Sequence, residues 1–219
     1  MTKIDFRSNP PLDSFVLLDA SILLALFTPV REASGAINHS LYKAHNDVLS
    51  FLSYVVPQVT NGNVLLVTLD LAIEECTHHI VTKGIDRDMG AGGSTRLQKA
   101  QTRYRQMQAR SSNRTPATAI SAVNLYKFDA RVIRDYLPIV HDFIAAVRAL
   151  PIAILTPAEL QGIGALLPEQ MLAEMKRYDL LAADAYYLAV ARNIGISTVA
   201  TVDKDWLRAK DDFTILINR

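Results

Sequence analysis

Acidic side chains occur at four well-separated places where an apolar segment begins or ends. They are Asp19, the pair Glu74 and Glu75, Asp184, and the pair Asp203 and Asp205. Taken singly, each acid is also typical of a helix cap or a loop. Carboxylates that crowd together without Lys or Arg partners repel one another, and a divalent cation relieves this repulsion. Oxygen ligands select Mg²⁺ or Mn²⁺, so the set predicts metal-assisted phosphoryl transfer if the fold brings the four places together.

Five short apolar runs are typical of strands that are buried on both faces. They cover residues 15–18, 64–67, 152–155, 198–202 and 213–217. Because helical patterns separate them, we expect an α/β fold with three α/β/α layers and a central, mostly parallel five-stranded sheet. Ligands of such sheets bind beyond the carboxyl ends of the strands. Asp19 and Asp203 each follow a predicted strand, which places both at that edge.

Helical patterns fill the stretches between these runs. They cover residues 20–27, 39–56, a segment from Thr68 or Asp70 through at least Ile80, 95–110, one or two helices within 119–150, and further segments up to Asn193. Breaks are expected near Pro138, at Pro168 and around Tyr178. Gly195 is expected to end the last helix as its C-cap.

The net charge of +1 hides an uneven distribution of charge along the chain. Residues 82–150 carry 12 Lys and Arg against 5 Asp and Glu, so this segment has a net charge of +7. We expect it to be a basic helical insertion, at about 82–150, in a single domain spanning 1–219. Either it is a solvated helix face, or its Lys and Arg side chains neutralise the phosphates of a polyanion. The residues predicted to do so are Arg96, Lys99, Arg103, Arg105 and Arg110.

The single cysteine, Cys76, excludes an internal disulfide and zinc sites built on two or four cysteines. The first eleven residues are polar and lack the apolar core of a signal peptide. No uncharged apolar run approaches the roughly 18–20 residues that cross a bilayer. We therefore expect a cytoplasmic protein without a membrane partner.

Several segments resemble those of PIN-domain ribonucleases. They are Phe15-Val-Leu-Leu-Asp-Ala-Ser-Ile, Ala72-Ile-Glu-Glu-Cys, Ala183-Asp-Ala-Tyr-Tyr-Leu-Ala-Val-Ala-Arg-Asn-Ile-Gly and Ser197-Thr-Val-Ala-Thr-Val-Asp-Lys-Asp-Trp. The match covers roughly residues 13–82 and 150–217. By this resemblance Asp19, Asp184 and Asp203 take metal-binding positions, with Asp205 as the alternative to Asp203.

The second acid of the family pattern is either Glu75 or Glu74. The family places apolar residues three and two before its Glu and one after it, which fits Glu75 better. On a helix, Ala72, Ile73 and Cys76 form an apolar stripe, and Glu75 lies nearer to this stripe than Glu74. We therefore assign Glu75, and Glu74 remains the alternative.

The resemblance implies a Mg²⁺- or Mn²⁺-dependent endoribonuclease. Its catalytic and metal-binding residues would be Asp19, Glu75, Asp184 and Asp203. A metal-activated water would cut single-stranded RNA and leave a 3′-hydroxyl and a 5′-phosphate, while the basic residues of 96–114 hold the RNA. PIN relatives often dimerise, so the resemblance also implies a homodimer.

Two other functions fit the same fold. The first is the toxin of a toxin–antitoxin pair, with an antitoxin protein as partner and the same chemistry. The compact toxins of this family lack a segment like 82–150, which ranks this reading below a general nuclease. The second is a non-catalytic module that binds RNA or another protein. The completeness of the acidic set favours an active site over such a module.

Overall fold

The computed structural model of this chain describes residues 12–27, 39–111, 120–160 and 167–216. The polar first eleven residues and Ile217, the end of the fifth predicted strand, lie outside the described residues. The described chain divides into two compact units. The sheet unit contains residues 12–27, 39–76 and 147–216, and the helical unit contains residues 77–146. The helical unit covers nearly the same residues as the insertion predicted at about 82–150.

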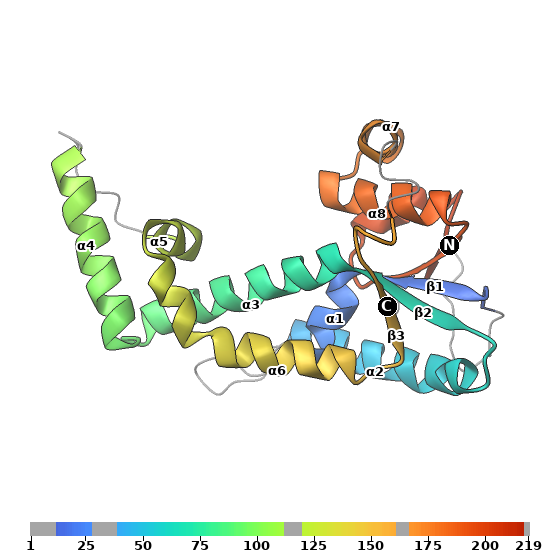
Figure 1. Ribbon diagram of the computed structural model, residues 1–219, viewed down its shortest axis with the longest axis horizontal. Coiled ribbons are helices and arrows are strands. Elements are labelled where there is room, and N and C mark those ends of the chain that lie inside the picture. The colour runs from blue at the N-terminus through green and yellow to red at the C-terminus, as the bar shows by residue number, and fades with distance from the viewer. Residues whose placement is uncertain (1–11, 28–38, 112–119, 161–166, 217–219) are drawn as a thin grey trace. The chain divides into compact units, whose positions relative to one another are not determined.

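Five parallel strands form the sheet of the sheet unit (Figure 1). They are β1 (Phe15–Leu18), β2 (Leu65–Leu69), β3 (Ile152–Leu155), β4 (Thr198–Ala200) and β5 (Thr214–Leu216). Their order across the sheet is β3-β2-β1-β4-β5, and every pairing is parallel. The predicted α/β fold is confirmed. The strand order reverses at β1, between β2 and β4, and open parallel sheets bind ligands beyond the carboxyl ends of the strands at such a reversal.

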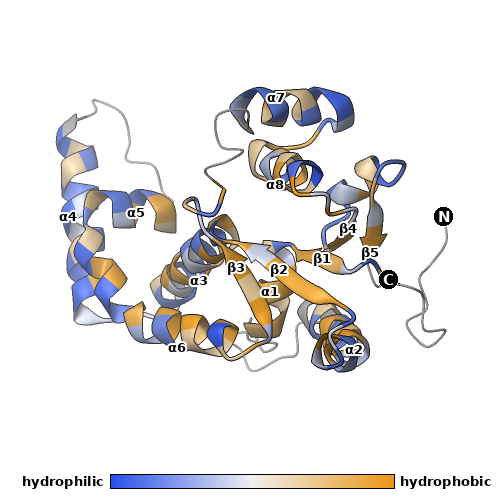
Figure 2. Ribbon diagram, turned by 45° about the vertical axis from the view of Figure 1, so that its right-hand side comes forward, coloured by the Kyte–Doolittle hydropathy of each residue, from blue (hydrophilic) through white to orange (hydrophobic). Residues whose placement is uncertain are grey.

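Helices cover both faces of this sheet (Figure 2). On one face lie α1 (Ala20–Phe27) and α2 (His39–Thr60), and on the other lie α7 (Leu167–Tyr178) and α8 (Ala182–Asn193). Successive side chains of a strand point to opposite faces. Val16 and Leu18 of β1 therefore share one core cluster with Phe51 and Val55 of α2, while Leu17 points the other way. The strands are mainly apolar because most of their side chains are buried or half-buried, and Thr68 and Thr198 are buried polar exceptions.

The remaining helices belong wholly or mainly to the helical unit. They are the second part of α3 (Asp70–Gly90), α4 (Thr95–Ser111), α5 (Ala122–Phe128), the 3₁₀ helix η2 (Ala130–Asp135) and nearly all of α6 (Leu137–Arg148). Ile85, Leu97, Leu125 and Val132 are buried in an apolar cluster that this unit builds from its own residues. The basic segment is thus a packed unit and not a loop.

Two prolines near predicted breaks each stand at the beginning of a helix. Pro138 and Pro168 each stand second in their helix, in α6 and α7. The first turn of a helix leaves its N–H groups without partners inside the helix, so a proline costs little there. The interruption near Pro138 falls earlier, between α5 and α6, and is filled by η2. The expected break around Tyr178 is confirmed, because α7 ends at that residue.

Other element bounds differ from the sequence expectation by a few residues. β2 ends two residues later than predicted and β4 two residues earlier, while α3 runs on to Gly90. Gly195 follows α8 with φ +73°, and the N–H of Ile196 donates to the carbonyl of Ala191. This is the predicted C-cap. None of the helices in the described parts of the chain is both long and apolar enough to span a membrane.

Candidate active site at the carboxyl edge of the sheet

Asp19 stands at the point where the strand order reverses. It directly follows β1, and its backbone N–H donates to the carbonyl oxygen of Ala200, the last residue of β4, over 3.0 Å. This bond fixes the Asp19 backbone between the carboxyl ends of the two strands. Its side chain is buried, with 5% of the residue exposed. A buried carboxylate needs hydrogen bonds or a cation to offset the loss of water.

Two hydroxyl groups supply part of that compensation. Ser21 Oγ donates to Asp19 Oδ2 over 2.5 Å, and Thr201 Oγ1 donates to the same oxygen over 2.9 Å. Each hydroxyl also accepts a backbone N–H, Ser21 from Val202 and Thr201 from Asp203. Among the described residues, no side-chain hydroxyl donates to Oδ1 of Asp19. The network therefore orients Asp19 and ties the segment after β4 to it.

These hydrogen bonds do not fully offset the cost of burial. Loss of water raises the pKa of Asp19 above its usual range, and the hydrogen bonds from Ser21 and Thr201 oppose that rise. A raised carboxyl pKa means that the anion is the disfavoured form. The site therefore favours either a proton or a positive charge at Asp19.

Glu75 is the glutamate of α3 that lies close to Asp19. It is half-buried, and Tyr187 Oη donates to its Oε2 over 3.3 Å. Burial, followed by repulsion from Asp19, raises the pKa of Glu75. Tyr187 is itself fully buried and packs edge-to-face on Trp206 with ring centroids 6.1 Å apart, so the phenol is held in place.

Glu74, the alternative to Glu75, is exposed. The charge of Glu74 is not among those that raise the pKa of Asp184 or Cys76, whereas the charge of Glu75 raises both pKa values. The difference follows from the helix, because consecutive residues point about 100° apart. Glu75 therefore belongs to this cluster of carboxylates, and Glu74 faces elsewhere.

Asp184 is the third acid of the cluster with a raised pKa. Burial and repulsion from Asp19, Asp203 and Glu75 raise the pKa of Asp184 to about 7. Asp184 sits in the first turn of α8, where the helix dipole favours a negative charge, yet the neighbouring carboxylates dominate. The repulsion shows that the fold places four acids that are far apart in the sequence near one another.

Asp203 and Asp205 differ in what else they contact. Asp203 is exposed, its N–H donates to Thr201 Oγ1, and its Oδ1 accepts the N–H of Asp205 over 2.9 Å. Asp205 forms an ion pair with Arg208 at 3.2 Å on the 3₁₀ helix η3 (Asp205–Ala209). Both raise the pKa of Asp184, and Asp203 contributes more. Because Arg208 already neutralises part of the charge of Asp205, Asp203 is the better candidate ligand for a metal ion.

The four carboxylates share one electrostatic environment without forming a finished coordination shell. Within residues 12–27, 39–111, 120–160 and 167–216, no three His, Cys, Asp or Glu side chains are placed to hold a metal ion together. The donor chemistry nevertheless suits a hard divalent cation, because carboxylate oxygens with raised pKa values lie near one another. Binding requires side-chain rotation, and Asp203 is the most exposed of the four acids.

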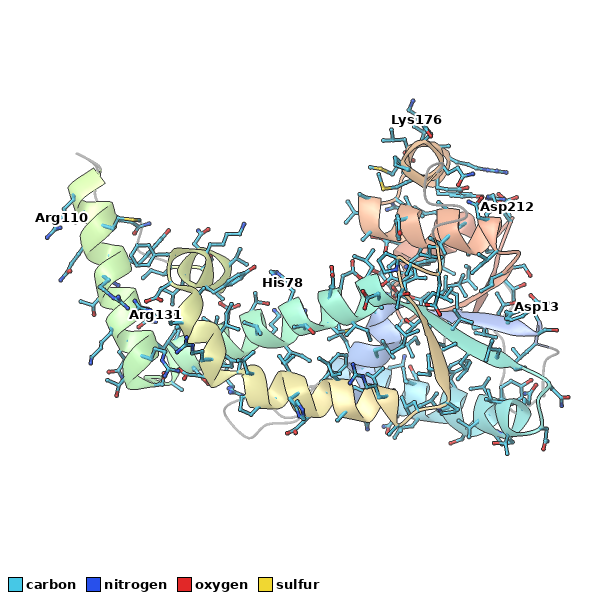
Figure 3. All side chains as sticks on the ribbon, in the orientation of Figure 1. Asp13, His78, Arg110, Arg131, Lys176 and Asp212 are labelled. Atoms are coloured by element: carbon cyan, nitrogen blue, oxygen red, sulfur yellow. The ribbon has the colours of Figure 1, made fainter. Side chains whose placement is uncertain are left out.

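The five predicted polyanion-binding residues all lie on α4 in the helical unit. Two of them are engaged within the unit, since Arg96 pairs with Asp135 and Arg103 pairs with Asp129. The other three, Lys99, Arg105 and Arg110, are exposed and have no ion-pair partner in the described part of the chain. Figure 3 shows Arg110 near the far end of α4 and Arg131 on η2. Arg131 also pairs with Asp129.

Sequence reasoning missed the hydroxyl and phenol groups that orient the acids. Ser21 stands two residues after Asp19, and Thr201 stands two residues before Asp203. Short polar side chains two residues from an Asp are typical of local hydrogen-bonded turns, which is a signal that could have found them. Tyr187 carries no such local signal, because its partner Glu75 lies 112 residues away in the chain.

Comparison with known proteins adds nothing to this geometry, since no protein-family model and no curated protein matches the chain.

Proposed function

We propose that this protein is a metal-dependent endoribonuclease of the PIN type, with Asp19, Glu75, Asp184 and Asp203 as its acidic site. One observation carries the proposal. Burial and mutual repulsion raise the pKa values of Asp19, Glu75 and Asp184 at the carboxyl edge of a parallel sheet, where the strand order reverses. Strongly perturbed carboxyls that gather at a ligand edge are typical of functional sites.

Hydrogen bonds from neighbouring side chains orient the acids of the site. Ser21 and Thr201 hold Oδ2 of Asp19, which leaves Oδ1 as the oxygen expected to face a cation. Tyr187 donates to Glu75 and limits its rotation. Asp184, half-buried beside them, would lose its proton when a cation binds, because its raised pKa holds a proton there near neutral pH.

Mg²⁺ or Mn²⁺ held by these carboxylates supplies an activated water and neutralises charge on the phosphate that is attacked. Four carboxylates without a cationic partner would otherwise repel an RNA backbone. Arg208 is the one cation paired with a member of the wider cluster among the described ion pairs, and it engages Asp205 only. The acidic site thus needs a bound cation before it can accept a phosphodiester.

RNA is the polyanion that suits the exposed basic residues of α4. Lys99, Arg105 and Arg110 carry charges that no described acid neutralises. They are available to phosphates, whereas Arg96 and Arg103 would first have to leave Asp135 and Asp129. We propose that these three residues provide most of the electrostatic binding of RNA.

Cleavage of an end-labelled single-stranded RNA, with Mn²⁺ and with EDTA, tests the proposal. Asp19→Asn is expected to lower cleavage by about 100-fold or more, because it removes a charge from the centre of the cluster. Asp13→Asn is the matched control, since Asp13 accepts hydrogen bonds from Ser197 and Thr198 at the amino ends of β1 and β4. It should cleave like the wild type.

A non-catalytic RNA-binding module is the second candidate function. The observation that favours it is the lack of a finished coordination shell within the described residues. The same assay separates the two functions. RNA that is bound in a salt-sensitive way by wild type and Asp19→Asn, and cut by neither, would contradict the nuclease and favour the module.

A further inference from the structure

A cavity of about 460 Å³ opens in the sheet unit beyond the ends of β2 and β3. Its walls are mainly apolar and include Leu69 of β2, Leu155 of β3, and Leu160. Tyr186 of α8 adds an aromatic ring, which is half-buried. The volume is in the range of cavities that enclose small organic ligands. The acidic site described above uses none of these side chains.

Two helices that carry acids of the site also line this cavity. On α3, Asp70 and Glu74 line it four residues apart and so share one face of the helix, with Glu75 next in the chain. On α8, Ala183 and Tyr186 line it three residues apart, with Asp184 next to Ala183. The cavity and the carboxylate cluster therefore lie on adjacent faces of the same two helices. One ligand can therefore contact both the cavity and the carboxylate cluster.

The charged groups that line the cavity are acceptors, and Tyr186 adds a hydroxyl group. Among the described residues, Asp70 and Glu74 are the only charged residues of the lining, and neither has an ion-pair partner there. A phosphate would be repelled here. A planar apolar group with N–H donors on its edge is attracted, because its face stacks on Tyr186 and its edge donates to a carboxylate. Nucleobases combine these two properties.

We propose that the cavity binds a guanine base of the RNA next to the phosphodiester that is cut. The proposal rests on the proposed ribonuclease function. Guanine presents two neighbouring N–H donors, N1–H and the 2-amino group, to a single carboxylate such as Glu74. Uracil offers one N–H between two carbonyl oxygens, which a carboxylate repels. Proteins commonly read unstacked RNA bases in this way, by stacking and by hydrogen bonds to the Watson–Crick edge.

The first experiment measures nucleoside binding without metal and without cleavage. Guanosine and uridine are titrated, in EDTA, into wild type and into the variants Tyr186→Ala, Tyr186→Phe and Glu74→Gln. Guanosine should bind and uridine should bind at least about tenfold more weakly. Tyr186→Ala and Glu74→Gln should each weaken guanosine binding about tenfold, whereas Tyr186→Phe keeps a stacking face and should stay near the wild type.

Glu169→Gln is the matched control, because Glu169 is an exposed acid of α7 that does not line the cavity. It should bind guanosine like the wild type. Equal binding of guanosine and uridine, or guanosine binding that is unchanged in Tyr186→Ala, would overturn the proposal.

The second experiment maps the cut sites of the wild type in an RNA of random sequence with Mn²⁺. Guanine should be enriched at one position beside the cut, and Glu74→Gln should lose this enrichment. Cuts without any base preference would overturn the proposal even if cleavage occurs. If no protein cuts RNA but guanosine binding is lost in Tyr186→Ala and Glu74→Gln, the nuclease function is contradicted and the guanine pocket is supported.

Discussion

At Asp19, stability and function are expected to oppose each other. The carboxyl is buried and its pKa is raised, so the folded protein holds an unfavourable charge there at neutral pH. Asparagine has nearly the same shape and no charge. Asp19→Asn should therefore abolish cleavage while the melting temperature, in EDTA, stays the same or rises by a few degrees, about 2–4 °C per kcal/mol.

Differential scanning calorimetry of wild type and Asp19→Asn in EDTA checks this expectation. Asp13→Asn again serves as the control. Asp13 accepts hydrogen bonds from Ser197 and Thr198, which lower the pKa of its carboxyl, so its loss should lower the melting temperature. A marked loss of stability in Asp19→Asn would mean that Asp19 is a structural acid held by its hydroxyl partners.

Asp184 makes the stability of the metal-free protein depend on pH. Its pKa is raised to about 7 in the fold, whereas an unfolded Asp has a pKa of about 3.9. Between these values the folded state binds more protons than the unfolded state. Its contribution to stability is complete below about pH 4 and is lost as the pH rises through about 7.

In EDTA, the melting temperature should therefore fall between pH 5 and pH 8, and Asp184→Asn should show a smaller fall. Asp142→Asn, at an exposed Asp of α6, is the control for the substitution itself. If the melting temperature falls equally in wild type and Asp184→Asn, the pKa of Asp184 is not raised in the folded protein, and the prediction is wrong.

Among the elements, the segment after β4 is held to Asp19 through two hydroxyls, and that of Thr201 also binds Asp203. Thr201 Oγ1 donates to Asp19 and accepts the N–H of Asp203, so it links two acids of the site. Thr201→Val has the same shape without either bond. Cleavage should fall by about 10–100-fold, as when groups that orient metal ligands are removed, while the fold persists.

Thr198→Val, at the first residue of β4, is the matched control for Thr201→Val. Thr198 is buried, and its hydroxyl donates to Asp13 at the amino end of β4, away from the acids. This variant should lose some stability but cut RNA at the wild-type rate. Equal cleavage by both variants would remove Thr201 from the site.

Gly84 of α3 is a packing requirement inside the helical unit. A Cβ there would lie 2.6 Å from Cδ1 of the Tyr136 ring, and Tyr136 Oη donates to Asp88 on the same helix. Gly84→Ala gains helix propensity but forces this ring to move, and overpacking of this kind costs about 1–3 kcal/mol. We expect a net destabilisation of the helical unit, measured as faster hydrogen exchange in residues 77–146.

Gly90→Ala is the control for the gain in helix propensity that a Gly-to-Ala change brings. Gly90 is the last residue of α3, its φ is not positive, and a Cβ there would meet no atom within 4 Å. It should be neutral or slightly stabilising. Protection from exchange that is unchanged in Gly84→Ala would mean that Tyr136 rearranges without cost.

The elements were largely predictable and their side-chain contacts were not. Each apolar run became a strand because burial on both faces leaves little choice of residue type, and Asp19 marks where β1 ends. The choice between Glu74 and Glu75 also followed from helical geometry. The hydrogen bond from Tyr187 to Glu75 joins two helices through tertiary packing, and no local pattern encodes it. The cavity lined by α3 and α8 could not be predicted from the sequence either, since its lining comes from four separate stretches of the chain.

At the scale of the whole molecule, the basic residues divide into engaged and available ones. Of the 12 Lys and Arg side chains in residues 82–150, Arg96 and Arg103 are paired with acids and are therefore less available to RNA. Replacing Lys99, Arg105 and Arg110 together by Gln should weaken RNA binding. The slope of log K against log salt should also become shallower by about 0.7 per lost phosphate contact.

Filter binding at several salt concentrations measures this slope. The control removes the same charge elsewhere, at the exposed residues Lys43, Lys176 and Lys210 of the sheet unit. It should change the slope much less. Equal slopes for the two triple variants would mean that RNA is attracted by net charge and not by α4.

The main prediction is that the four carboxylates bind a divalent cation. Mn²⁺ titration followed by electron paramagnetic resonance, without RNA, observes it directly, because free and bound Mn²⁺ give different signals. We expect wild type to bind Mn²⁺, Asp19→Asn and Asp184→Asn each to lose that binding, and Asp13→Asn to keep it. Mn²⁺ binding that survives both substitutions, or that is absent from the wild type at millimolar metal, would contradict a metal-dependent active site at this edge of the sheet.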